Sequence, residues 1–239
     1  MMEIRIERAT TLKEKPKAGE ALGFGKYYTD HMFVMDWDRG QGWHDARIVP
    51  FGPIPMDPAS MVLHYAQETF EGLKAYRTKD DRILLFRPEM NARRFANSNR
   101  RLCMPEVAEE DFVEAVTQLV ACEKDWVPAE EGTSLYIRPF MFATEAAVGV
   151  HPACSYKFVI ILSPVGAYYP EGVNPVKIYV EDEYGRHRLY QVRRQLRCQH
   201  RCAGQGRGNG LHTGIVAGWC PPQIRRGSRY DECHVHDRQ

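Results

Sequence analysis

Apolar residues recur at two different spacings along the chain, and each spacing predicts its own kind of element. Within residues 111–122 they lie mostly three or four positions apart, which places an apolar stripe along one face of a helix. The residues of that stripe are Phe112, Val116, Leu119 and Val120. A second helix is expected to begin at Pro88, because the missing N–H of a proline costs nothing in the first turn of a helix.

Alternation predicts strands elsewhere. In residues 134–143, Leu135 and Ile137 alternate with Tyr136 and Arg138, so the two pairs occupy opposite faces of a strand. Shorter apolar runs indicate strands at residues 32–37, 82–86, 156–162 and 176–180. Two segments are less clear: residues 48–54 read as a connector interrupted by proline, and residues 60–67 fit a helix or a strand. Residues 1–163 are therefore expected to form one α+β domain.

Proline and glycine punctuate residues 164–175, which favours a linker to a second domain whose first strand occupies residues 176–184. The composition changes after that strand. Residues 1–184 hold 21 Lys and Arg against 28 Asp and Glu, whereas residues 185–239 hold 11 Arg, no Lys and 3 acidic residues. Such a break marks a domain boundary or a basic, disordered tail.

Composition disfavours several classes of protein. The formal net charge of +1 does not indicate a nucleic-acid partner. No segment approaches the roughly 18 consecutive apolar residues of a membrane span, and the N-terminus mixes charged with apolar residues, unlike a secretory signal. The 7 cysteines show no disulfide spacing. We expect a cytoplasmic protein with no membrane partner, no nucleic-acid partner and no metal site.

Five segments identify a family. In chain order they read GFGKYYTDHMFVMDWD, HYAQETFEGLKAYR, LFRPEMNARRFANSNRRLCMP, SLYIRPFMFATEAAVGV and VIILSPVGAYYP. They resemble the branched-chain amino acid aminotransferases, which are pyridoxal 5′-phosphate (PLP) enzymes of fold type IV. The resemblance covers residues 17–184. It implies a homodimer of two-domain subunits, similar to D-amino acid aminotransferase, with part of the substrate pocket at the subunit interface.

The resemblance also implies the reaction, which is transfer of the amino group of leucine, isoleucine or valine to 2-oxoglutarate, giving glutamate. Arg94 matches the arginine that holds the PLP phosphate. A guanidinium suits a phosphate dianion because it offers a fork of donors and stays charged. The neighbouring Arg93, Arg100 and Arg101 are expected to be surface charges.

The other candidate residues match positions that line the substrate site. Tyr136 and Arg138 are expected to face the substrate, with Arg138 near its carboxylate. Phe24, Tyr65, Phe70 and Tyr168 match residues around the substrate side chain, although without the resemblance each would be assigned to the core. Aromatic walls with one charged end suit branched-chain amino acids and their keto acids. Because one methylene changes binding by only about 1–3 kcal/mol, overlapping specificity for the three amino acids is expected.

The chain departs from the family where the chemistry would occur. In the family, a lysine in a motif like GGTGFxKxGGNY forms a Schiff base with PLP and moves a proton between substrate and cofactor. That motif is absent here, and no lysine follows Lys177, which lies in a predicted strand. The sequence therefore assigns no catalytic residue.

A shifted reading frame accounts for this departure. Residues 185–197 can be back-translated with permitted codons that, read one base later, encode GGTGFTKFGGNYA. The same offset turns residues 213–228 into QVLWLDGVHRKYVEEV and residues 229–235 into GTMNVMF, which resemble later segments of the family. The hypothesis is that residues 185–239 are a frameshifted translation. It fails if no single-base change in the coding DNA around codon 185 restores the motif.

Alternatives stay open for the tail and for the function. Cys198, His200 and Cys202 could belong to a zinc site, but their spacing is irregular. The arginines of residues 186–201 could bind nucleic acid, although few aromatic residues accompany them. Disorder fits the composition of the tail better than either site.

The alternative function is a non-catalytic fragment that folds but cannot bind PLP covalently. The segments FEGLKAYR and SLYIRP disfavour related enzymes that act on other substrates.

Overall fold

The computed structural model describes residues 2–17, 19–166, 178–181 and 213–216. The chain divides into two compact units, Met1–Gly172 and Val173–Gln239. Because most of residues 164–175 lie outside the described residues, the predicted bounds of the linker stay a prediction. No described helix combines the length and the apolar character that crossing a membrane would require.

The first unit is an α+β domain built on one eight-stranded sheet. Its elements in chain order are β1 (Arg5–Ile6), β2 (His31–Asp38), β3 (Gly42–Pro50), α1 (Met61–Tyr65), β4 (Glu68–Phe70), β5 (Leu73–Arg77), β6 (Ile83–Leu85), α2 (Pro88–Arg101), α3 (Glu109–Cys122), a short 3-10 turn (Lys124–Trp126), β7 (Ser134–Ala143) and β8 (Ser155–Val165).

The strands lie in the order β1-β3-β2-β8-β7-β5-β6, and β4 pairs with a separate stretch of β7. β1 runs parallel to β3, while the other pairs of this sheet are antiparallel. The longest pairing joins β7 to β8, from Ser134 opposite Val165 to Ala143 opposite Tyr156. β7 also pairs with both β4 and β5, the two strands that contain most of the FEGLKAYR segment.

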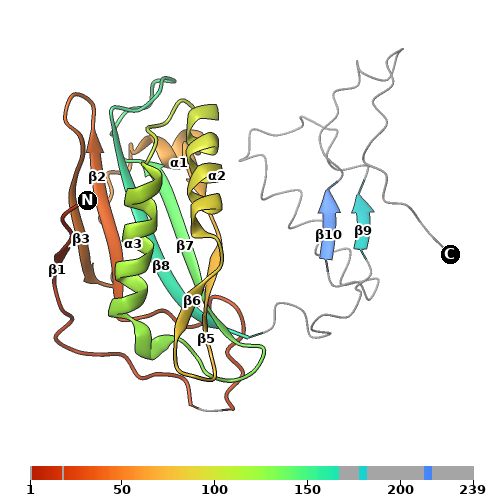
Figure 1. The fold of residues 1–239 in the computed structure, drawn as a ribbon. Helices are drawn as coiled ribbons and strands as arrows, with labels where there is room; N and C mark the ends of the chain where they lie inside the picture. Colours follow the sequence, from red (N-terminus) through yellow and green to blue (C-terminus); the bar gives the residue numbers. More distant parts are fainter. Residues whose placement is uncertain (1, 18, 167–177, 182–212, 217–239) are drawn as a thin grey trace. The chain divides into compact units, whose positions relative to one another are not determined.

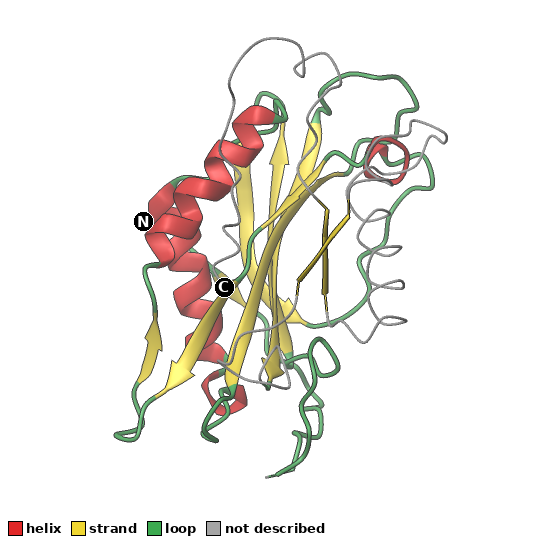
Figure 2. Cartoon of the chain, turned by 90° about the vertical axis from the view of Figure 1, so that its right-hand side faces the viewer, coloured by secondary structure: helices red, strands yellow, loops and turns green. Residues whose placement is uncertain are grey.

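The helices α2 and α3 cover one face of this sheet (Figures 1 and 2). The rings of Phe95 on α2 and Phe112 on α3 lie 5.4 and 5.8 Å from the ring of Phe158 on β8. All three side chains are fully buried. Burying such a side chain contributes about 1.5–3 kcal/mol, so these aromatic contacts fix the helices to the sheet.

Most predicted elements agree with the structure. The predicted helix at residues 111–122 is α3, which begins two residues earlier with an acidic first turn that its N-terminal dipole stabilises. α2 begins at Pro88 as predicted. The prediction for residues 48–54 was wrong in part, because residues 48–50 complete β3, where Ile48 pairs with Phe33. Residues 60–67 contain the short helix α1, which ends where Ala66 adopts a left-handed conformation.

In the second unit, β9 (Ile178–Glu181) and β10 (Thr213–Val216) pair in parallel. β9 overlaps the strand predicted at residues 176–180. The rest of residues 185–239 lies outside the described residues. The predictions of a frameshifted and disordered tail therefore stay predictions.

Candidate functional site

The face of β7 that points away from α2 and α3 carries the candidate substrate residues. Leu135 and Ile137 are fully buried in the core beneath the helices. Tyr136 and Arg138 alternate with them and are half-buried on the opposite face. The predicted separation of the two pairs is confirmed by this arrangement.

Arg138 is held among aromatic groups. Its Nη2 donates to Tyr136 Oη at 2.6 Å, and its Nε donates more weakly to the same oxygen at 3.2 Å. The guanidinium carbon lies 4.5 Å from the ring centre of Phe70 and 5.2 Å from that of Tyr136. Among the described residues, Nη1 has no hydrogen-bond partner. The Arg138 guanidinium is thus a fixed positive charge with unused N–H donors beside an apolar surface.

Phe24 completes this cluster from the N-terminal segment. Its ring centre lies 4.8 Å from that of Tyr136, and 48% of the residue is exposed. Ser163 pairs with Tyr136 across β7 and β8, and its buried hydroxyl has no partner within the described chain. The structure thus brings together four predicted residues, Phe24, Phe70, Tyr136 and Arg138.

The other predicted aromatic residues are placed differently. Tyr65, the last residue of α1, donates its hydroxyl to the carbonyl of Val148 and has its ring beside that of His64. It is therefore fixed by a loop and not by the Arg138 cluster. Tyr168 lies outside the described residues.

Arg94, the candidate phosphate ligand, projects from α2 with 68% of its side chain exposed. Its Nε and Nη2 donate to the two carboxylate oxygens of Glu71, at 2.6 and 2.7 Å. These hydrogen bonds and the negative charge of Glu71 raise the pKa of the Arg94 guanidinium. Glu71 directly follows Phe70, so one short turn connects Arg94 to the aromatic cluster.

The three arginines expected at the surface, Arg93, Arg100 and Arg101, are indeed exposed, and Arg93 and Arg100 belong to separate ion pairs. Arg93 donates to Glu109 at 2.8 and 3.2 Å, and Arg100 donates to Glu106 at 2.8 and 2.6 Å. Both acceptors are far more exposed than Glu71. Solvent screens such pairs, and they stabilise a fold by little.

Two residues of this region were missed by the sequence prediction, Glu71 and Asn91. Asn91 donates from Nδ2 to Glu71 at 2.9 Å and to the carbonyl of Gly72 at 3.3 Å. An open pocket lies beside this contact, lined by Gly72, Leu73, Lys74, Tyr76, Phe86, Asn91 and Tyr136. The burial of Glu71 follows from the alternation of an extended segment, in which residues 69 and 71 point to the same face and Thr69 is buried.

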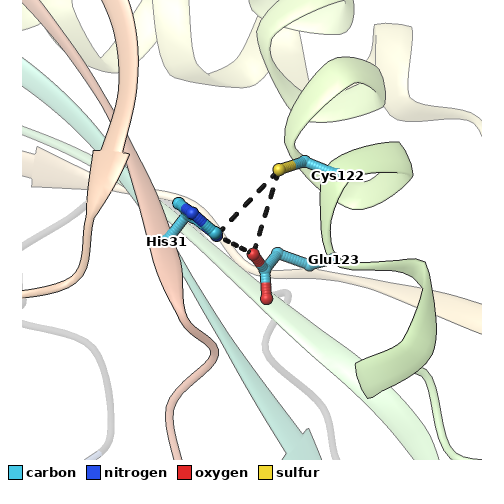
Figure 3. A group of neighbouring side chains, drawn as sticks. All are labelled: His31, Cys122 and Glu123. Atoms are coloured by element: carbon cyan, nitrogen blue, oxygen red, sulfur yellow. Dashed lines mark hydrogen bonds and ion pairs between the residues drawn. The ribbon is translucent and has the colours of Figure 1, made fainter. Parts of the chain in front are cut away.

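A second polar cluster joins β2 to the end of α3, where His31, Cys122 and Glu123 lie together (Figure 3). His31 Nδ1 contacts Glu123 Oε1, and the Cys122 sulfur lies 4.0 Å from both atoms. These side chains belong to types that bind metal ions. Whether they can bind a metal ion here depends on which of their atoms already form hydrogen bonds.

The backbone N–H of Ala9 donates to His31 Nε2 at 2.8 Å. Nε2 must then be unprotonated, so Nδ1 carries the proton and donates it to Glu123. Nδ1 offers no lone pair to a metal in this arrangement. Burial raises the pKa of the Cys122 thiol, to which Arg8 donates at 3.1 Å. The cluster fastens the N-terminal segment to α3.

Comparisons with known proteins find similar sequences, although no family model matches the chain. The chain is 57% identical over 183 residues to branched-chain-amino-acid aminotransferase 2 of Bacillus subtilis and 58% identical over 184 residues to branched-chain-amino-acid transaminase 1 of the same organism. These matches cover 77% and 76% of this chain but 50% and 51% of the relatives. The chain thus spans about half the length of the curated relatives it matches.

Solved structures show the same fold. The branched-chain amino acid aminotransferase of Escherichia coli matches with a TM-score of 0.57 at 21% identity, over 76% of this chain and 59% of that one. The branched-chain aminotransferase of the archaeon Thermoproteus uzoniensis, solved with norvaline, matches with a TM-score of 0.57 at 19% identity, over 79% and 60%. The predicted α+β, fold-type-IV architecture is confirmed by these matches. Over three-quarters of its length, the chain is 57–58% identical to branched-chain aminotransferases.

Proposed function

We propose that this chain forms the substrate-binding and phosphate-binding part of a PLP-dependent branched-chain amino acid aminotransferase. The reaction is transfer of the amino group of leucine, isoleucine or valine to 2-oxoglutarate. The observation that carries the proposal is the position of Arg138, hydrogen-bonded to Tyr136 and stacked on Phe70. Both classes of substrate have a carboxylate that can accept from this guanidinium.

The aromatic side chains account for the preferred substrates. Phe70 and Tyr136 flank the Arg138 cation, and Phe24 packs against Tyr136, which gives an apolar surface that suits a short branched hydrocarbon. Tyr65, which lies outside this cluster, and Tyr168 are proposed as further contacts of the substrate side chain. Glutamate and 2-oxoglutarate bind the same cation through one carboxylate, so a single site serves both halves of the reaction.

The residues present fit the phosphate end of PLP. Arg94 is exposed, is held in one orientation by Glu71, and has no partner for its Nη1 among the described residues. When bound, PLP supplies an electron sink that makes the substrate Cα–H acidic. Arg94 would hold the phosphate, while Arg138 and Tyr136 orient the substrate. We further propose a cytoplasmic homodimer.

An isotope-transfer assay tests this function. Because the chain lacks the Schiff-base lysine, the assay uses the protein encoded once the reading frame at codon 185 is restored; with PLP, ¹⁵N-leucine and 2-oxoglutarate it is expected to give ¹⁵N-glutamate, detected by mass spectrometry. Arg138→Gln should reduce the rate at least about 100-fold, because a buried carboxylate loses its charged partner. Arg82→Gln is the matched control, since Arg82 is an exposed arginine paired with Asp80. Equal rates for wild type and Arg138→Gln would contradict the proposal.

One observation favours the alternative of a non-catalytic fragment: no lysine follows Lys177. PLP bound covalently to a lysine absorbs visible light. A colourless chain after PLP addition and dialysis, together with no ¹⁵N-glutamate, would favour the fragment. Coding DNA around codon 185 then distinguishes a frameshift from a native tail.

A further inference from the structure

We infer that Glu71 is a positioning residue that orients Arg94 for phosphate binding. This inference rests on the proposed function, because it concerns the same phosphate site. It adds to that function a specific requirement: Arg94 alone is not sufficient, and a buried carboxylate behind it must fix its donors.

Glu71 is unusually placed for an acidic residue. Only 2% of its side chain is exposed, whereas 68% of the Arg94 side chain is exposed. A buried carboxylate is strongly destabilising unless several donors satisfy it. Glu71 receives hydrogen bonds from Arg94 Nε and Nη2, from Asn91 Nδ2 and, at 3.3 Å, from the backbone N–H of Gly72. The carboxylate is thus fixed from three directions.

The geometry of the pair determines which donors of Arg94 remain. The two carboxylate oxygens occupy Nε and one N–H of Nη2, leaving both N–H groups of Nη1 and the second of Nη2. Because 68% of the Arg94 side chain is exposed, these remaining donors are open to a ligand. A phosphate can therefore bind Arg94 without displacing Glu71.

Orientation matters because arginine is flexible. An exposed arginine samples many rotamers, and a ligand that binds it must order the side chain at an entropic cost. Glu71 orders Arg94 before a ligand arrives. Asn91, three residues earlier on α2, supports the carboxylate from the same helix face.

α2 provides a matched control next to this pair. Arg93 also donates through Nε and Nη2 to a single carboxylate, that of Glu109. Both partners of that pair are substantially exposed, with 59% and 35% of their side chains accessible. Glu109→Gln therefore removes the same chemical contact from a neighbouring arginine without touching Arg94.

The first experiment needs no ligand. In ¹⁵N NMR spectra of the 239-residue chain, the Arg94 Nε–H signal should be resolved and slow to exchange with water, because Glu71 accepts from it. Glu71→Gln should broaden that signal or increase its exchange at least about 10-fold, while Glu109→Gln leaves it unchanged. Asn91→Ala gives a second, milder perturbation. An Arg94 signal unaffected by Glu71→Gln would overturn the inference.

The second experiment measures binding of pyridoxamine 5′-phosphate and of pyridoxamine to the same proteins. Glu71→Gln should weaken the phosphate-bearing ligand by about 10- to 100-fold, as for other residues that orient a direct ligand-binding group, and leave pyridoxamine unchanged. In an Arg94→Gln background, Glu71→Gln should have no further effect, because both act through one guanidinium. Glu71→Asp should restore part of the affinity.

The outcomes separate the two claims. If wild type binds both compounds equally, or if Arg94→Gln changes nothing, the phosphate role of Arg94 is wrong. If Arg94→Gln weakens phosphate-dependent binding but Glu71→Gln does not, the phosphate role stands and the role of Glu71 is wrong. Additive effects of the two substitutions would show that Glu71 acts through the fold in general, and this would also overturn the inference.

Discussion

Gly72 lies against Tyr136 so closely that a Cβ at residue 72 would overlap Tyr136 Oη and approach Cζ to 3.2 Å. The same hydroxyl accepts hydrogen bonds from Arg138. The backbone of the FEGLKAYR segment therefore sets the position of the ring that orients the candidate carboxylate-binding arginine. Two segments far apart in the chain, HYAQETFEGLKAYR and SLYIRPFMFATEAAVGV, form one unit here because β5 pairs with β7.

Gly72→Ala is expected to displace the Tyr136 ring and with it Arg138. Forcing a methyl group into an occupied space costs about 1–3 kcal/mol. We expect a loss of unfolding free energy of this size in urea, and weaker binding of the keto acid of leucine. Gly52→Ala is the control, because a Cβ there meets nothing within 4 Å. Unchanged keto-acid binding in Gly72→Ala would show that Tyr136 does not orient Arg138.

His31→Ala should destabilise the first unit strongly. The substitution leaves the buried Glu123 carboxylate and the Ala9 N–H without their His31 partner and opens a cavity. The expected loss is about 2–4 kcal/mol, measured by urea unfolding followed by circular dichroism. His44→Ala removes a more exposed pair with Asp38 and should cost less than about 1 kcal/mol. Similar losses for both variants would contradict this account of the cluster.

Asp36 should make stability depend on pH in the acid range. Burial would raise the pKa of its carboxyl, but hydrogen bonds from Lys157 and Arg47 outweigh burial and hold that pKa below its usual value of 3.8. A carboxyl with a lowered folded pKa stabilises the fold above its unfolded pKa. This contribution is lost as the pH falls through the folded value.

The measurement is the free energy of unfolding between about pH 6 and about pH 2. Asp36→Asn should flatten the acid part of the curve. A curve identical to that of wild type would show that Asp36 titrates equally in the folded and unfolded chain.

Cysteine labelling should discriminate between Cys103 and Cys122. Cys103 is exposed, while Cys122 is half-buried with a thiol pKa raised by burial. A raised pKa leaves less thiolate at a given pH, and thiolate is the reactive form. Iodoacetamide at neutral pH should therefore modify Cys103 first, as read by peptide mass spectrometry. Faster modification of Cys122 would show that its environment is more open than the contacts with His31 and Arg8 indicate.

Local pattern was sufficient to predict the elements whose signal lies within one segment. α3 was predictable because its apolar stripe repeats at helical spacing, and β7 because Leu135 and Ile137 alternate with Tyr136 and Arg138. The end of β3 was missed because proline was taken as a breaker. Pro50 is tolerated there as the last residue of the strand.

The site was only partly predictable, for a physical reason. Phe24, Phe70, Tyr136 and Arg138 were identified by resemblance, and the structure brings them together. The role of Glu71 depends on a contact with α2, and a one-dimensional pattern cannot show which helix will lie behind a turn. Tyr65 was grouped with these residues by resemblance, yet its hydroxyl is engaged by a loop around Val148.

A crystal structure of the 239-residue chain with pyridoxamine 5′-phosphate and the keto acid of leucine tests the central claim most directly. The account predicts the phosphate on the free donors of Arg94, the carboxylate on Arg138, and the branched side chain between Phe24 and Phe70. A phosphate bound away from Arg94, or a carboxylate that does not contact Arg138, would contradict it.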